Sequence, residues 1–199
     1  MNKQGNHTTS QPITDWGKVL ELIQRLESME KYKLSLYITL QSYWGLRANE
    51  VLNLKWMDIL EKDEVVVFQT KNQKNRVIPV HPFVKETIIR IYRLMKYPNP
   101  NNYFTRSVKY STSNKPMSIS YINKELKKWN RRFNMGLERI STHSLRKSMV
   151  RRVMSLSKPS EFNIRLVEVS KMLGHSTPSQ TVTYCGIEKE SLDNLYTNM

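Results

Sequence analysis

The chain has 199 residues, 39% of them apolar, and is therefore long enough to bury a sizeable core as one domain. Its 32 Lys and Arg residues outnumber its 17 Asp and Glu residues, and the resulting net charge of +15 suits a polyanionic partner such as nucleic acid. The single cysteine, Cys185, excludes an internal disulfide and a cysteine-rich zinc module, which agrees with a reducing, cytoplasmic setting. Residues 1–12 lack the apolar stretch of a signal peptide, and no apolar run approaches the roughly 20 residues that span a bilayer.

Apolar periodicity and capping residues predict three helices in the first part of the chain, at about 14–29, 32–44 and 47–54. The first helix would be capped by Thr14 or Asp15, and the second would stop at Gly45. Two β-rich runs, 64–69 and 76–80, flank a polar turn and predict an antiparallel hairpin.

The rest of the chain is also predicted to be helical, apart from an irregular surface connection over about 97–116 and a loop at 155–161. The expected helices start at His81-Pro82, at Ser118 or Ser120 and at Thr142, with two more over 162–173 and 178–186. The predicted fold class is therefore α+β, mainly α-helical, with a small antiparallel hairpin at one edge.

The helix that starts at Ser118 or Ser120 has an apolar stripe and a strongly basic remainder. Ile122, Leu126 and Trp129 form the stripe. We expect the cations of this helix to lie along a DNA backbone: Lys124, Lys127, Lys128, Arg131 and Arg132.

Four short stretches follow one another along the chain and carry residues suited to phosphate chemistry: GLRANEVL (45–52), THSLRKS (142–148), MLGHST (172–177) and VTYCG (182–186). In the second, His143, Arg146 and Lys147 share one helix face. In the third, Gly174 ends a helix and His175 follows it directly. Tyr184 comes nine positions after His175.

These stretches resemble the tyrosine recombinase (phage integrase) family, whose pattern is an Arg in a GLR-x-x-E box, then H-x-L-R, then LGH, then a nucleophilic Tyr. The resemblance covers roughly residues 15–190, the catalytic domain of that family. It implies a catalytic set made of Arg47, Lys71, His143, Arg146, His175 and Tyr184, with Glu50 and Lys147 in supporting roles. Lys147 stands where many family members have His or Arg.

The lysine of this set is implied by the hairpin. The family has a catalytic lysine in a stretch resembling G-K-x-x-K-x-R-x-x-P, and residues 70–79 read TKNQKNRVIP. Lys71 takes the catalytic position, but Thr70 replaces the glycine and changes the turn, so the choice between Lys71 and Lys74 stays open. Lys74 is otherwise expected to contact a DNA phosphate.

The residue types fit the cleavage of a DNA strand. A tyrosine hydroxyl titrates near 10 in water and needs a base or a stabilised anion before it attacks. Arginines such as Arg47 and Arg146 are always charged and can bind two phosphate oxygens at once. A lysine can protonate the leaving 5′ oxygen. The resemblance implies a 3′-phosphotyrosyl intermediate that conserves the energy of the bond, so rejoining needs no ATP. No metal or other cofactor is expected, because cations already surround the developing charge.

Other functions share parts of this pattern. The leading hypothesis is a site-specific recombinase of a mobile element, used for integration, excision or inversion. A type IB topoisomerase-like or telomere-resolving strand transferase would use the same nucleophile and cations. A non-catalytic DNA-binding regulator on the same fold is a third possibility, although such a protein would not need all six catalytic residues.

The predicted organisation is a flexible tail at 1–13, a catalytic domain at 14–187 and a tail helix at 188–199 that could be exchanged between protomers. Most relatives have a preceding helical core-binding domain, which would be missing here. The expected partner is double-stranded DNA, with a monomer in solution and a homotetramer on DNA. The expected location is the cytoplasm, with the nucleoid.

Overall fold

The computed structural model describes residues 10–69, 73–107 and 114–185. Its elements, in chain order, are α1 (Trp16–Ser28), α2 (Tyr32–Trp44), α3 (Ala48–Leu52), α4 (Trp56–Ile59), β1 (Glu64–Gln69), β2 (Lys74–Pro79), α5 (Pro82–Leu94), α6 (Ile119–Arg132), α7 (Thr142–Ser155), the short 3-10 helix η1 (Pro159–Glu161), α8 (Phe162–Leu173) and α9 (Pro178–Cys185). The mainly helical α+β class predicted from the sequence is confirmed. None of the helices in these ranges is long and apolar enough to cross a membrane.

Side-chain caps and left-handed glycines set several helix ends. Asp15, rather than Thr14, caps α1 by accepting from the backbone N of Gly17 at 2.8 Å. Ser118 caps α6 in the same way. At the other end, α2 stops at Gly45 with φ of 59°, and α8 stops at Gly174 with φ of 66°.

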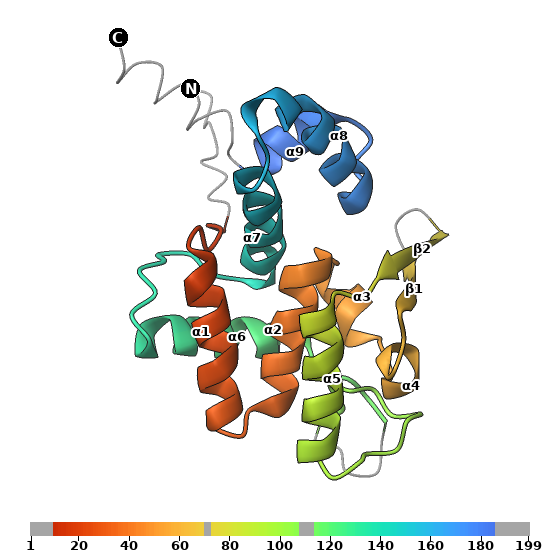
Figure 1. Cartoon of the computed structure of the whole chain (residues 1–199). Helices are drawn as coiled ribbons and strands as arrows, with labels where there is room; N and C mark the ends of the chain where they lie inside the picture. Colours follow the sequence, from red (N-terminus) through yellow and green to blue (C-terminus); the bar gives the residue numbers. More distant parts are fainter. Residues whose placement is uncertain (1–9, 70–72, 108–113, 186–199) are drawn as a thin grey trace, which may run out of the picture.

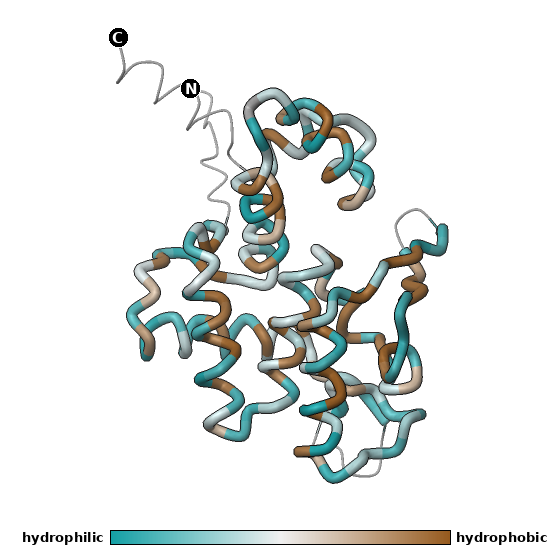
Figure 2. The backbone as a smooth tube through the Cα atoms, viewed as in Figure 1, coloured by the Kyte–Doolittle hydropathy of each residue, from teal (hydrophilic) through white to brown (hydrophobic). Residues whose placement is uncertain are grey.

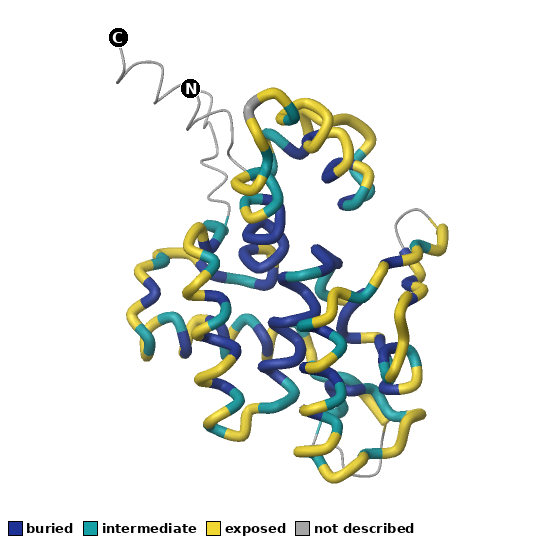
Figure 3. Tube along the Cα trace, viewed as in Figure 1, coloured by how far each residue is buried: buried dark blue, intermediate teal, exposed yellow. Residues whose placement is uncertain are grey.

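Helix α2 lies at the centre of the main body. Nearly every residue from Leu34 to Trp44 is buried, because the helix is covered by α1, α5 and α7. Figure 3 shows this helix as an almost unbroken buried segment between half-exposed neighbours. The body is extended by α4, whose Trp56 packs against Tyr92 and Phe104 with ring centroids 5.1 and 6.1 Å away. The sequence did not predict α4, since four residues are too few to show a helical period.

The hairpin pairs β1 with β2 in antiparallel register, with Val65 opposite Ile78 and Val66 opposite Val77. Its inner face is buried, whereas Val66 and Val77 on the outer face are exposed. Strand β2 begins at Lys74, two residues earlier than predicted, because Lys74 pairs with Gln69 in the ladder.

Helix α7 connects the main body to a smaller lobe formed by α8 and α9 (Figure 1). The lobe has its own hydrophobic cluster, in which Met149 and Val150 of α7 pack with Val169 and Leu173 of α8. In Figure 2 the apolar positions of α8 and α9 alternate with polar ones, as expected for helices that bury one side only. The lobe therefore rests on few buried side chains compared with the body.

Residues 10–13, the described part of the predicted flexible tail at 1–13, contact the main body. Ile13 is 3% exposed, and its backbone N donates to Oγ of Ser148 at 2.7 Å. The backbone N of Gln11 donates to the carbonyl of Arg139 at 2.9 Å. Residues 10–13 thus belong to the folded body, because one apolar side chain anchors them. The predicted tail helix at 188–199 lies outside the described residues.

Candidate active site

Arg47 and Glu50 form an ion pair at the start of α3. Arg47 is the N-cap residue, and its backbone N donates to Oε2 of Glu50 at 2.8 Å while its Nη1 donates to Oε1 at 2.9 Å. The carboxylate side chain is only 2% exposed, whereas the arginine side chain is 28% exposed. Glu50 therefore fixes the direction of Arg47 and leaves part of the guanidinium accessible.

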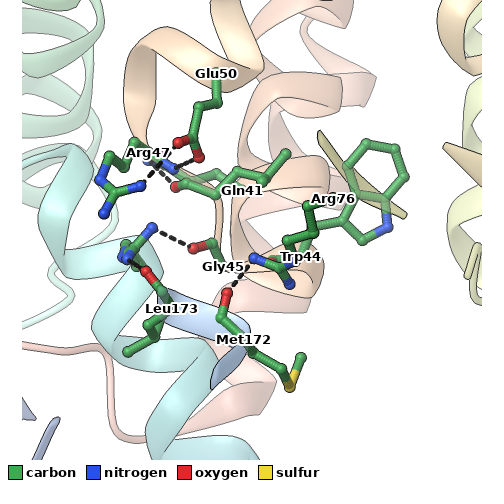
Figure 4. Close-up of polar contacts among 10 residues, drawn as sticks. Gln41, Trp44, Gly45, Arg47, Glu50, Arg76, Met172 and Leu173 are labelled. Carbon is green, nitrogen blue, oxygen red and sulfur yellow. Dashed lines mark hydrogen bonds and ion pairs between the residues drawn. The ribbon is translucent and has the colours of Figure 1, made fainter. Parts of the chain in front are cut away.

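Arg146 is buried in the second turn of α7 and is bonded to two helix ends, whose residues Gly45 and Leu173 are labelled in Figure 4. Its Nη1 donates to the carbonyl of Gly45 at 2.8 Å, and its Nη2 donates to the carbonyl of Leu173 at 2.6 Å. Burial is the main reason that its pKa is lowered to about 10, and the charge of Arg47 adds to the effect. The side chain is still cationic at neutral pH.

Two features of this arrangement favour glycine at position 45. Its left-handed φ of 59° is costly for other residues, and an added Cβ would lie 2.1 Å from Cε of Met149. A side chain at position 45 would therefore have to displace the methyl end of Met149, which packs from α7 against the end of α2.

His143 and Tyr184 meet at the opening of the site. Nδ1 of His143 lies 3.2 Å from Oη of Tyr184. Partial burial, followed by the positive charges of Arg146 and Lys147, lowers the pKa of His143 below its ordinary value of 6.5. A neutral imidazole with its proton on Nε2 presents Nδ1 as an acceptor for the hydroxyl proton of Tyr184.

Lys147 lies directly beneath the tyrosine. Its Nζ is 5.0 Å from the centre of the Tyr184 ring, and it donates to the carbonyl of Ser10 at 2.9 Å. The residue is only 4% exposed. Lys147 thus connects the segment before α1 to the tyrosine, and its buried charge acts on both Tyr184 and His143.

His175 follows the left-handed Gly174 and is held by α9. Its Nδ1 lies 2.8 Å from Oγ1 of Thr181, which in turn lies 2.6 Å from Oγ of Ser170. The rings of His175 and Tyr184 are 5.5 Å apart between centroids. The sequence did not identify Thr181 or Ser170. The sequence offers one hint for Thr181, which precedes Tyr184 by three positions and so lies nearly one helical turn before it, on the same side of the helix.

The site opens onto a concave surface made of adjoining hollows. One hollow is lined by Arg47, Glu50, Asn123 and His143, among others. The next is lined by residues around His143 and Tyr184 and includes Lys127. A third follows α6 and shares Asn123 with the first hollow and Lys127 with the second.

The predicted cations of α6 divide into two groups across this surface. Lys124, Lys127 and Arg131 line the hollows. Lys128 and Arg132 instead lie over the ring of Trp129, at 4.9 and 5.2 Å from its centroid. The helix therefore presents only part of its charge to the concave side.

The hairpin contributes a residue that the sequence did not single out. Arg76 of β2 donates through Nη1 to the carbonyl of Met172 and through Nη2 to the carbonyl of Trp44, the latter at 3.4 Å. Lys74 is exposed at the start of the same strand, and the contacts of the site among the described residues do not include it. Lys71, the predicted general acid, lies outside the described residues.

The sequence matches the model of the Phage integrase family over residues 15–191. The chain belongs to the phage integrase family. It is 29% identical over 187 residues to the probable integrase/recombinase YoeC of Bacillus subtilis (strain 168), covering 94% of each chain. It is 26% identical over 154 residues to tyrosine recombinase XerC of Rickettsia canadensis (strain McKiel), covering 77% of this chain but 47% of that protein.

Solved structures of tyrosine recombinases share the fold of this integrase family member. The XerA recombinase superposes with a TM-score of 0.68 at 19% identity, covering 92% of this chain and 63% of that one. The XerH recombinase, in a post-cleavage complex with its difH substrate, gives a TM-score of 0.71 at 18% identity, covering 98% of this chain and 55% of that one. The chain thus spans about half the length of several tyrosine recombinases, although it spans nearly all of YoeC.

Among the described residues, no group of three or more His, Cys, Asp or Glu side chains is arranged to hold a metal ion. Arg146 and Lys147 both place a positive charge close to Tyr184, and Arg47 lies within electrostatic range of Arg146. The site is therefore a cationic pocket around a hydroxyl group.

Proposed function

We propose that this chain is the catalytic domain of a site-specific DNA recombinase that cuts and rejoins DNA through Tyr184. The contact between Tyr184 and a histidine that is neutral at physiological pH carries the proposal, because it joins a nucleophile to a base. Two arginines lie beside this pair, as phosphate chemistry requires.

In the proposed cleavage step, His143 accepts the phenolic proton as Oη of Tyr184 attacks the scissile phosphorus. The charge on the non-bridging oxygens is stabilised by Arg47 and Arg146. Arg146 uses two of its five N–H groups on the carbonyls of Gly45 and Leu173, which holds the guanidinium plane in place. The bond from phosphorus to the 5′ oxygen then breaks and leaves a 3′-phosphotyrosyl link.

The leaving 5′ oxygen needs a proton, and Lys71 is the proposed donor, with Lys74 as the alternative. A scissile bond made with a 5′-bridging sulfur needs no such proton, because a thiolate is a better leaving group. That substrate should restore cleavage in the variant that lacks the true acid, so comparing Lys71→Ala with Lys74→Ala assigns the role. Rejoining reverses these steps and uses no metal, cofactor or ATP.

The proposed partner is double-stranded DNA bound along the concave surface. The net charge of +15 and the cations of α6 that line its hollows support this. Among the fold relatives, a lambda integrase tetramer has been solved on a Holliday junction. We extend this to a monomer in solution that forms tetramers on DNA at the nucleoid, and to a function in integration, excision or inversion.

Because the target sequence is unknown, the test uses a pool of duplexes with a randomised centre and a nick near it. When the strand is cut next to the nick, the short fragment that carries the 5′ hydroxyl diffuses away. Rejoining is then prevented, and the protein stays covalently bound to the DNA. The wild-type chain should give adducts that survive denaturing electrophoresis, and sequencing of the trapped DNA should reveal a shared site. Tyr184→Phe is the matched control. Bound duplexes without adduct would instead indicate a DNA-binding protein that does not cut.

A further inference from the structure

Arg76 is a largely buried cation that the proposed cleavage chemistry does not use. It lies on β2 opposite Val67 and points away from the strand ladder towards the lobe. Burial lowers its pKa, and the nearby charges of Glu50 and Arg47 act on it in opposite directions. Arg76 therefore sits within the electrostatic field of the active site, although its two hydrogen bonds go to main-chain carbonyls.

The same two helix ends receive both Arg76 and Arg146. At the end of α2, Arg76 bonds the carbonyl of Trp44 and Arg146 bonds that of Gly45. At the end of α8, Arg76 bonds the carbonyl of Met172 and Arg146 bonds that of Leu173. We call this pair of guanidiniums the arginine clamp. Figure 4 shows Arg76 of this pair with the helix-end residues Trp44, Gly45, Met172 and Leu173.

The chemistry of helix ends explains why cations are found there. The last carbonyls of a helix have no partner within the helix, and the C-terminal end carries partial negative charge. Both α2 and α8 turn into a left-handed glycine, so their final carbonyls point out of the helix. A guanidinium can bond one carbonyl from each helix at once, which an ammonium group does less well because it lacks a planar fork.

The clamp joins the two halves of the site. Past Gly45 the chain leads in two residues to Arg47, and past Gly174 it leads directly to His175. Helix α8 packs mainly on α7 and α9, and the apolar cluster of the lobe is separate from the main core. The clamp is therefore a direct polar link between the element that presents Arg47 and the lobe that presents Tyr184.

We propose that Arg76 is a positioning residue for DNA cleavage, which holds the α8–α9 lobe and the hairpin against the end of α2 and so fixes Tyr184 relative to Arg47. This rests on the proposed function. Arg76 does not touch the phosphate. It acts through the carbonyls of Met172 and Trp44. A misplacement of about 1 Å can slow a reaction by about 10²-fold, so losing the link should lower the rate of cleavage more than the affinity for DNA.

The test compares Arg76→Gln and Arg76→Lys with a control variant, Arg93→Gln. The control removes one positive charge, as Arg76→Gln does, but from an exposed arginine of α5. Three quantities are measured: the single-turnover rate of adduct formation at saturating DNA, the Kd for DNA, and amide hydrogen exchange in the free protein. Arg76→Gln should cut the rate by about tenfold or more, while Kd changes by less than about threefold. Arg76→Lys should recover part of the rate. Arg93→Gln should match the wild type.

Hydrogen exchange separates positioning from general stability. In Arg76→Gln, exchange should rise in peptides covering 166–185 and at the end of α2, while α1 and α5 keep their protection. A wild-type cleavage rate, or a rise in exchange spread over the whole body, would overturn the proposal. If Arg76→Gln does not fold, the cleavage rate and the pattern of hydrogen exchange of Arg76→Lys decide instead. A wild-type protein that forms no adduct contradicts the proposed function, but the exchange measurement still tests the clamp.

Discussion

Oη of Tyr184 lies 3.2 Å from Nδ1 of His143, although the two residues are 41 positions apart in the sequence. The contact brings the first turn of α7 against α9. Nearby charges act on the histidine as well, since Arg146 and Lys147 both lower its pKa after the effect of burial. The protonation state of His143 therefore becomes the first property to test.

The rate of adduct formation should depend on pH through His143. A base must be neutral, and the pKa of His143 is below 6.5, so the rate should be flat near neutrality and fall only as pH drops through the lowered pKa. Lys147→Gln removes one of the positive charges that lower this pKa, so the pKa of His143 should rise. The fall of the rate at low pH, the acid limb of the profile, should therefore begin at a higher pH. Lys171→Gln, which changes an exposed lysine of α8, is the control and should leave the limb in place. An acid limb at the same pH in all three proteins would contradict the assignment of His143 as base.

The two arginines should be needed for the rate and should not be replaceable by lysine. Arg47→Ala and Arg146→Ala should each slow cleavage by roughly 10²–10³-fold, as expected when a donor to the developing charge is lost. Arg146→Lys should be nearly as slow, because a single ammonium cannot bond the carbonyls of Gly45 and Leu173 and also bind a phosphate. Single-turnover rates at saturating DNA measure this. An Arg146→Lys variant with near wild-type activity would show that charge alone suffices.

The cations of α6 should contribute unequally to DNA binding. Replacing both Lys127 and Arg131 by Ala removes cations that line the concave surface, so the slope of log affinity against log salt should become shallower by about 0.9 for each lost phosphate contact. Replacing Lys128 and Arg132 removes the same charge from the side that packs over Trp129. The second pair should leave the slope nearly unchanged. Equal changes from both pairs would indicate binding governed by net charge rather than by this surface.

Gly45→Ala should destabilise the fold more than a left-handed backbone alone explains. The backbone term is about 1–2 kcal/mol, and displacement of the Met149 side chain adds to it. Gly136→Ala provides the matched control, because Gly136 also has positive φ but no atom within 4 Å of an added Cβ. Denaturant unfolding of the three proteins gives the comparison. Equal losses for the two variants would mean that the contact between Gly45 and α7 adds nothing.

The fold and the motif residues could be predicted largely from the sequence, because each rests on a local pattern. The apolar periodicity of α1 and α5, the caps of α1 and α6 and the glycines that end α2 and α8 are all visible within a few residues. The grouping of Arg47, His143, Arg146 and Tyr184 followed from the family resemblance, since nothing local relates residues so far apart.

Other parts depend on the folded chain. The role of Arg76 could not be predicted because its acceptors are main-chain carbonyls, which every residue has. Residues 10–13 were predicted as part of a tail, because a single buried isoleucine, Ile13, does not produce a periodic apolar pattern. The division of the α6 cations depends on where Trp129 packs, which sets the side of the helix that faces the hollows.

The most direct test of the account is to identify the residue that becomes linked to DNA. Trapped adducts are digested with nuclease and protease, and the peptide that retains a nucleotide is sequenced by mass spectrometry. A single modified residue, Tyr184, is expected to be attached to a 3′ phosphate, and Tyr184→Phe should form no adduct. A nucleotide on any other residue, or an adduct that persists in Tyr184→Phe, would contradict it.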